Sequence, residues 1–267
     1  MKKIIPIIFL FCSFVYLQDE QPFPPLDLIS IPTAGTLPKG MYAFETLLHG
    51  EGNILPEFLI GITNNFSIGF SFGLQGFIGT GDIKKNKSAP EINIKYRIYE
   101  ETETFPALTI GFDTQGRGLY NKINERYDQK AMGLYLVASR NWSFLGNLGF
   151  HFGINKNIIE SKDGDEDINL FFGIDKEINR SFSILAEFNF ARNDDKLLDS
   201  NNEISLRDDK GFLNLGLRWS ATENILLELN FNDNLKNIKY LNNHDIQNPT
   251  TFKSRNRELK VMYVEQF

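Results

Sequence analysis

The stretch SFSILAEFNFA, residues 181–191, shows the pattern that decides the fold. Every second residue is apolar: Phe182, Ile184, Ala186, Phe188 and Phe190. The positions between them are mostly polar. Because successive side chains of a β-strand point to opposite faces of the sheet, this stretch predicts a strand with one apolar and one polar face.

The same alternation recurs in twelve segments spread over the chain. They cover residues 41–49, 54–63, 66–75, 91–99, 107–113, 131–139, 144–155, 167–175, 182–191, 212–219, 224–232 and 258–267. Pro56 is the weakest position, because proline removes a hydrogen bond from a sheet ladder. A chain that repeats this two-faced pattern throughout is predicted to be all-β.

The connections between these segments alternate in length. Turns such as residues 64–65, 141–143 and 221–223 are short, whereas most of the other links are long and charged. The long links cover residues 76–90, 114–130, 156–166, 192–211 and 233–257. Loops of that length are unusual in compact soluble domains. We therefore predict a closed antiparallel transmembrane β-barrel of about twelve strands, with short periplasmic turns and long extracellular loops.

The surrounding solvent explains this pattern. Hydrocarbon cannot hydrogen-bond a backbone group, so a sheet crosses a bilayer only as a closed barrel with an apolar outer face. A soluble, exported ligand-binding barrel would invert the two faces, and it stays open as an alternative. Aromatic residues near the short turns favour the membrane, because such residues form a girdle at its interface. They are Phe66, Tyr99, Phe105, Trp142, Phe144 and Trp219.

The N-terminus indicates export. A basic start, Met1 to Lys3, precedes an apolar run over residues 4–17 that is too short for a spanning helix and typical of a signal peptide. We expect a signal peptide at 1–18, a periplasmic N-terminal segment or partial plug at 19–39, and the barrel at 40–267. Cleavage would remove Cys12, the single cysteine, and with it disulfide and thiol chemistry. The expected location is the outer membrane of a diderm bacterium.

The C-terminal segment predicts how the barrel is inserted. It ends on Phe267, and Tyr263 lies on the same face. This ending resembles the C-terminal strand signal by which bacterial barrels reach their assembly machinery, although Glu265 departs from it. The expected partners are therefore outer-membrane lipid and the barrel assembly machinery.

Three stretches resemble a known family. They are IPTAG (residues 31–35) followed by Gly40, IKYRIYEE (residues 94–101), and PALTIGFD (residues 106–113) followed by Gly116 and Gly118. They look like the N-terminal part of YjbH-like outer-membrane proteins, and the likeness covers mainly residues 31–118. The resemblance implies a β-barrel associated with exopolysaccharide production and export, with polysaccharide as a further partner.

Eight charged residues fall on the polar faces, which would line the lumen. They are Glu45, Glu57, Lys95, Arg97, Glu187, Arg218, Glu228 and Lys260. The two signs are balanced, so these residues either line a polar pore or neutralise one another in a filled interior. A twelve-stranded barrel lies between filled eight-stranded and open sixteen-stranded ones. We predict a narrow channel or a scaffold linked to envelope polysaccharide export.

Other binding functions find little support in the sequence. The net charge of −6, from 28 basic and 34 acidic residues, gives no reason to bind nucleic acid. Asp163, Asp165 and Asp167 alternate like the start of a calcium loop, but Ile168 and Ile174 stand where that loop needs glycine and glutamate. We expect no metal and no cofactor.

Enzyme activity is likewise not expected. The alternative is an outer-membrane hydrolase of the lipase type. It would need a serine within hydrogen-bond distance of His49, His151 or His244, the three histidines of the chain.

Overall fold

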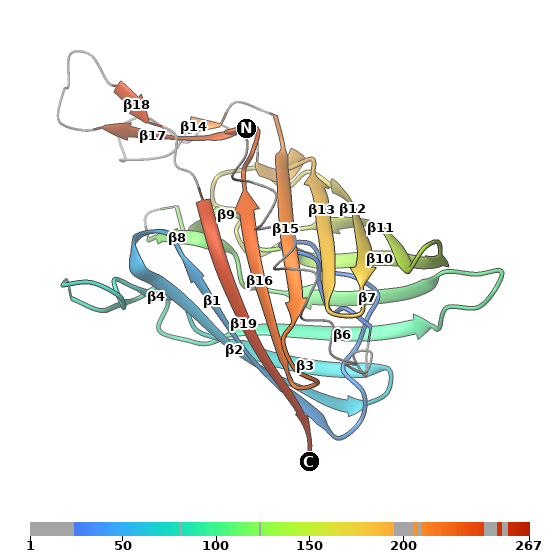
Figure 1. Ribbon diagram of the computed structural model, residues 1–267. Helices are drawn as coiled ribbons and strands as arrows, with labels where there is room; N and C mark the ends of the chain where they lie inside the picture. Colours follow the sequence, from blue (N-terminus) through green and yellow to red (C-terminus); the bar gives the residue numbers. More distant parts are fainter. Residues whose placement is uncertain are drawn as a thin grey trace, which may run out of the picture.

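The structure is a computed structural model that describes residues 24–80, 82–122, 124–194, 206–207, 210–242, 250–252 and 256–267. Twelve strands of this part of the chain form the wall of a closed antiparallel β-barrel, which confirms the predicted fold class (Figure 1). In chain order they are β1 (Met41–His49), β2 (Asn53–Thr63), β3 (Phe66–Ser71), β6 (Glu91–Tyr99), β7 (Ala107–Asp113), β10 (Gly133–Ser143), β11 (Asn147–Lys156), β12 (Asn169–Asn179), β13 (Phe182–Asn189), β15 (Phe212–Ser220), β16 (Ile225–Asn232) and β19 (Asn256–Gln266).

The barrel closes because its first strand pairs on both sides. β1 pairs with β2 and with β19, and both pairings are antiparallel. Glu45 of β1, for example, lies opposite Glu57 of β2 and Met262 of β19. The ring of hydrogen bonds therefore has no free edge, as a sheet within hydrocarbon requires.

The shorter elements lie outside this wall. β4 (Leu74–Gln75) and β5 (Lys84–Lys85) extend the hairpin of β3 and β6 beyond the barrel, and β8 (Arg117–Asn121) pairs with β9 (Arg126–Gln129). β14 (Leu206–Arg207), β17 (Ile238–Asn242) and β18 (Thr250–Phe252) form a small separate sheet. Two 3-10 turns are present, η1 (Gly50–Gly52) and η2 (Arg192–Asp194). None of the described residues belongs to a helix long and apolar enough to span a membrane.

Two strand boundaries differ from the predicted ones near the short turns. Residues 141–143, predicted as a turn, continue β10, and the turn lies at residues 144–146. Gly146 there has a φ of 96°, a left-handed conformation that favours glycine, and its carbonyl accepts a hydrogen bond from the Phe144 amide. β12 also runs past residue 175 to Asn179, so that the following turn is only residues 180–181.

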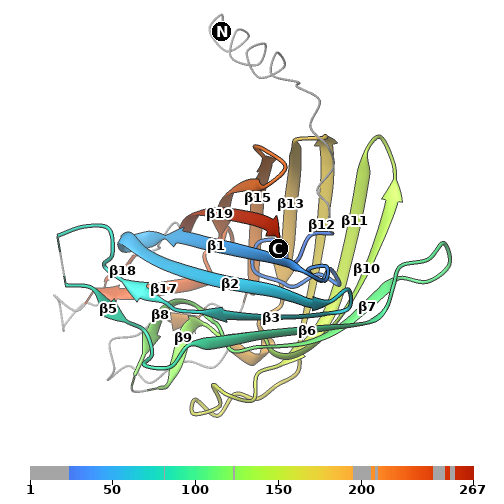
Figure 2. The same ribbon diagram turned by 90° about the horizontal axis from the view of Figure 1, so that it is seen from below.

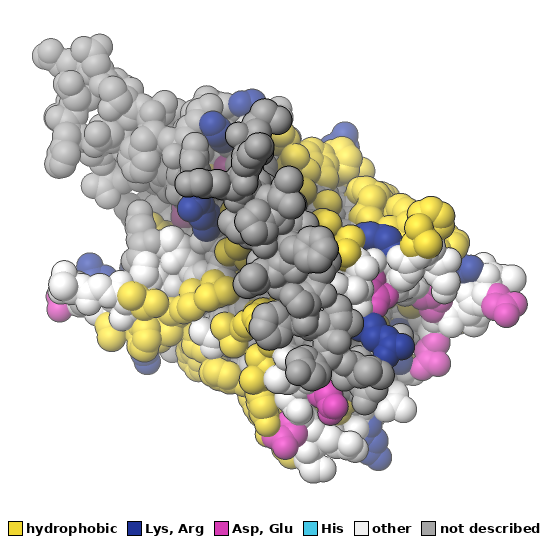
Figure 3. Space-filling view, viewed as in Figure 1, with side chains coloured by type: hydrophobic (Ala, Val, Ile, Leu, Met, Phe, Trp, Pro, Cys, Tyr) yellow, Lys and Arg dark blue, Asp and Glu magenta, His cyan; other side chains and the backbone are white. Residues whose placement is uncertain are grey.

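The outer face of the wall is apolar. On β13, Ile184 is 46% exposed, whereas the adjacent Leu185 is fully buried and Glu187 is 2% exposed. Every wall strand exposes at least one large apolar side chain in this way: Phe44, Phe58, Phe70, Tyr96, Ile110, Leu136, Phe152, Phe172, Ile184, Leu217, Leu229 and Leu259. Figure 3 shows apolar side chains spread over the visible wall. Soluble proteins rarely expose so large an apolar surface, so this belt faces hydrocarbon and the barrel is a transmembrane one.

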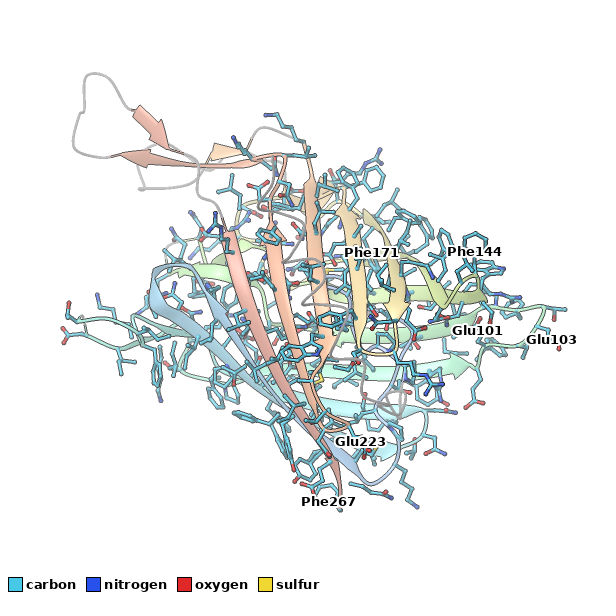
Figure 4. The ribbon with its side chains drawn as sticks, viewed as in Figure 1. Glu101, Glu103, Phe144, Phe171, Glu223 and Phe267 are labelled. Atoms are coloured by element: carbon cyan, nitrogen blue, oxygen red, sulfur yellow. The ribbon has the colours of Figure 1, made fainter. Side chains whose placement is uncertain are left out.

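The two ends of the barrel differ. Short turns lie at the end where the chain finishes, and most of the long loops lie at the other. Figure 4 places Phe144 and Phe267 at the short-turn end. Aromatic pairs gather there, since Phe182 stacks on Trp219 with ring centroids 5.8 Å apart and Tyr42 lies 5.0 Å from Phe267. This is the asymmetry of an outer-membrane barrel, whose short turns are periplasmic and whose long loops are extracellular.

The N-terminal segment lies inside the barrel. Residues 24–37, which we call the N-terminal plug, precede β1 at the periplasmic end and occupy the lumen (Figure 2). Leu28, Ile29 and Ile31 are fully buried and pack in one cluster with Phe171 and Leu185 of the wall. Burial contributes about 1.5–3 kcal/mol for each such side chain. Residues 24–37 of the segment expected at 19–39 thus lie in the lumen, whereas the expected signal peptide lies outside the described residues.

Candidate functional site: the plugged lumen

Glu187 holds the tip of the plug. Side chains of β13 point alternately to the lipid and to the lumen, and Glu187 lies on the lumen side, opposite to Ile184. Its carboxylate accepts hydrogen bonds from three successive backbone amides. Their nitrogens lie 2.9 Å away for Ile29, 2.9 Å for Ser30 and 3.2 Å for Ile31. The Ser30 hydroxyl and the Asn214 amide, at 2.7 Å, also donate to it. A buried charge thus satisfies backbone donors that would otherwise lack partners.

Lys260 binds the plug at Asp27. Its ammonium group is fully buried and lies 2.9 Å from Asp27 of the plug, 3.2 Å from Glu45 and 3.7 Å from Glu228. Arg218 donates to the Asp27 carbonyl at 2.8 Å, and Lys95 donates to the Leu26 carbonyl. Cations from three strands therefore bind residues 26–27 of the plug, and each of these buried cations has a polar partner there.

The loop between β7 and β10, which carries the β8–β9 hairpin, contacts the plug from the extracellular side. Arg117 of β8 pairs with Glu258 of β19 at 2.7 Å and donates to the Ile29 carbonyl of the plug. The Tyr127 hydroxyl donates to Glu91 of β6 at 2.9 Å. Loop and plug thus meet inside the barrel.

A buried ionic network fixes this loop. Asp163 lies 2.8 Å from Arg126 and 2.6 Å from Lys130, and Arg126 also pairs with Asp194. Glu160 accepts the Tyr127 amide at 2.7 Å, and burial raises the pKa of this carboxyl group. Asp163, the first residue of the calcium-like pattern, therefore serves as an ion-pair partner. The described residues contain no group of three or more His, Cys, Asp and Glu side chains suited to a metal.

One cavity lies beside the plug. It has a volume of about 70 Å³ and lies between the plug and the wall from β1 to β10, with Glu57, Lys95, Asp113 and Tyr135 in its lining. This volume has room for a few water molecules.

The predicted luminal residues separate into three groups. The first group surrounds the plug. Four of its side chains contact the plug directly, namely Lys95, Glu187, Arg218 and Lys260, and Glu45 and Glu228 lie beside Lys260. Glu57 lines the cavity and accepts a hydrogen bond from Asn93 at 3.2 Å. Arg97 lies apart, at the periplasmic turn, where it contacts Asn64, Asn65 and Glu100.

The two residues of the expected assembly signal lie on the outside. Phe267 is 77% exposed and contacts the ring of Tyr42. Tyr263 faces outward on β19 and donates to Glu265. Glu265, which departs from the signal pattern, is thus also a hydrogen-bond acceptor for Tyr42, at 2.9 Å.

Several residues of the site were not predicted. Asp27 belongs to a segment without alternation, and Arg117 belongs to a loop, so no periodic signal marked either. Glu258 and Asp113 do lie on inward positions of predicted strands, and the alternation could have identified them.

A serine, a histidine and an aspartate also form a buried chain in the wall. The Ser139 hydroxyl lies 2.7 Å from His151 Nδ1, and His151 Nε2 lies 2.7 Å from Asp175. Alternation places all three on the inner face of neighbouring strands β10, β11 and β12. Ser139 Oγ also accepts the Ala34 amide of the plug at 2.8 Å, so the plug covers it. His49 ends β1, and His244 lies outside the described residues.

Comparison with known proteins yields structural likenesses only. No protein-family model matches the chain, and no curated protein matches it. A structure described as KdgM porin shares 10% identity with a TM-score of 0.45, over 85% of this chain and 99% of that one. A NanC porin structure shares 10% identity with a TM-score of 0.40, over 85% and 99%. The outer membrane channel DcaP of Acinetobacter baumannii shares 8% identity with a TM-score of 0.28, over 84% and 95%.

Proposed function

We propose that this protein is a narrow outer-membrane channel that the N-terminal plug closes and that opens when the plug leaves the lumen. The supporting observation is that three cations around the plug keep carboxylate partners of their own without it. Lys260 retains Glu45 and Glu228, Arg218 retains Glu228 at 2.5 Å, and Arg117 retains Glu258. These three cations therefore stay paired in an open lumen, while Glu187 and Lys95 exchange their contacts with the plug for water.

Planar-bilayer recording tests this proposal. The full chain should rest closed with rare openings, whereas a variant lacking residues 24–37 should conduct steadily. A matched control is Arg97→Gln, which changes a luminal charge at the periplasmic turn without touching the plug. If the deleted variant folds as a barrel and still shows no conductance, the protein is a filled scaffold and the channel proposal is wrong.

We extend the proposal to envelope polysaccharide as the transported or bound material. The support is the sequence resemblance to YjbH-like proteins over residues 31–118. Liposomes that contain the plug-deleted variant should swell in neutral and acidic oligosaccharides at rates that fall with chain length. Exclusion of every saccharide, with free passage of small ions, would contradict this extension.

A second candidate function, a lipase-type hydrolase, is favoured by one observation, the Ser139–His151–Asp175 chain. Serine hydrolases use these residue types in hydrogen-bonded order. The plug-deleted variant, in which Ala34 no longer covers Ser139, should then hydrolyse a p-nitrophenyl ester, and Ser139→Ala should abolish this activity. Equal rates in the two variants would show that Ser139, His151 and Asp175 are not catalytic and serve only to attach the plug.

A further inference from the structure

A basic groove lies at the extracellular end, apart from the plug. It has a volume of about 920 Å³ and runs between the β4–β5 hairpin and the β8–β9 hairpin. Four lysines line it: Lys84, Lys85, Lys87 and Lys122. Its size is that of a site for an extended ligand rather than for a single small ion.

Three of the four lysines have no ion-pair partner within the described part of the chain. Lys84, Lys85 and Lys122 are exposed, whereas Lys87 pairs with Glu91 at 2.6 Å. Glu125, the one acidic residue of the lining, is neutralised by Lys162 at 2.8 Å. The groove therefore carries a local positive charge on a chain whose net charge is −6. Such a local field attracts anions.

One contact stabilises a wall of the groove and another joins its two walls. Asn86 is 4% exposed, and its side chain accepts a hydrogen bond from Gln75 at 2.5 Å. Lys87 crosses to the other hairpin, where its ammonium group lies 4.8 Å from the centre of the Tyr120 ring and 5.2 Å from that of Tyr127. These contacts shape the groove before any ligand arrives, which lowers the entropic cost of binding.

The groove opens toward water above the barrel mouth. Ser71 faces the lumen, since its hydroxyl donates to Gln115. Gln75 lies four residues beyond Ser71, so its side chain points to the same face. Lys84 is the cross-strand partner of Gln75 and therefore lies on that face too. The ligand is therefore expected from the aqueous side and not from the lipid.

We propose that this groove binds a soluble polyanion, a flexible chain whose carboxylate or phosphate groups reach Lys84, Lys85 and Lys122 together. A single exposed ion pair contributes little to binding, so a ligand must engage several lysines at once. This site does not depend on the proposed channel function, because binding requires no movement of the plug.

The test is titration of the full chain in detergent micelles with three probes, namely inorganic polyphosphate, an alginate oligosaccharide and uncharged maltohexaose. At least one acidic probe should bind, with an affinity that falls as salt is added. Binding of polyphosphate alone would identify a phosphate ligand, and binding of alginate would identify an acidic saccharide.

The variant Lys84→Gln/Lys85→Gln/Lys122→Gln should weaken this binding by about tenfold or more. The matched control Lys39→Gln/Arg180→Gln/Lys236→Gln removes three exposed cations elsewhere and should leave the affinity within about twofold. Equal loss in both variants, equal affinity for maltohexaose, or no binding of either acidic probe would overturn the proposal.

Discussion

Replacing Glu187 by glutamine should release the plug. The carboxylate accepts the amides of Ile29, Ser30 and Ile31, and all three are donors. Glutamine keeps one acceptor oxygen and turns the other into a donor. Either the Ile29 and Ile31 amides, which share one carboxylate oxygen, or the Asn214 amide, which donates to the other oxygen, therefore loses its acceptor. Hydrogen bonds to charged groups contribute about 1.5–3 kcal/mol each, and an unsatisfied buried group costs about 1–3 kcal/mol. A loss of about 3 kcal/mol in plug retention raises the open population roughly 100-fold.

Amide hydrogen exchange measures this change directly. The amides of Ile29, Ser30 and Ile31 should exchange roughly 100-fold faster in Glu187→Gln than in the parent protein. Glu57→Gln is the matched control, because Glu57 lines the lumen but accepts from Asn93 rather than from the plug. Unchanged protection of the three amides in Glu187→Gln would refute the assigned role of this carboxylate.

The structure makes four further predictions. Gly173→Val should loosen the plug by about 1–3 kcal/mol, because a Cβ atom there would lie 2.2 Å from Leu28 Cδ1; faster protease cleavage before residue 37 would be the readout, and parent-like resistance would contradict it. Arg126→Met should destabilise the extracellular loop by about 1–3 kcal/mol, since Asp163 and Asp194 each lose one ion pair while Asp163 keeps Lys130, and an unchanged thermal unfolding midpoint would count against this network. Burial raises the pKa of Glu160 in the folded protein. Its contribution to loop stability is therefore present at a pH below the pKa of the unfolded chain and is lost as the pH rises through the pKa of the folded protein. Limited proteolysis across this pH range should show the loss of stability, and Glu160→Gln should make the cleavage rate less dependent on pH. Deleting Phe267 should reduce insertion by the barrel assembly machinery, and normal insertion into outer-membrane vesicles would exclude an assembly role.

The wall of the barrel could be predicted because its signal is local. Each residue of β13 faces lipid or lumen according to its parity, so Ile184 and Glu187 were assigned to opposite faces from their positions alone. The turn near residue 142 was misplaced because Asn141, Trp142 and Ser143 look like a turn in composition. Gly146, whose left-handed conformation makes the turn, lies just beyond them.

The arrangement of the plug could not be predicted, because its contacts are distant in sequence. Ile29 and Glu187 are 158 positions apart, and Asp27 and Lys260 are 233 apart. Leu28, Ile29 and Ile31 pack against wall residues such as Phe171 and Leu185, and only closure of the barrel creates the surface that buries them. The Ser139–His151–Asp175 chain likewise depends on the register of three strands, which alternation alone does not fix.

A reversible lock on the plug tests the central claim most directly. The Ser30 hydroxyl lies 3.2 Å from the Asn214 amide nitrogen, so cysteines at these two positions can join the plug to β15. In a Glu187→Gln background, bilayers containing this double-cysteine variant should be silent when the disulfide is formed and should conduct after reduction. Full conductance with the disulfide intact would show that ions pass by another route and that the plug does not close the barrel.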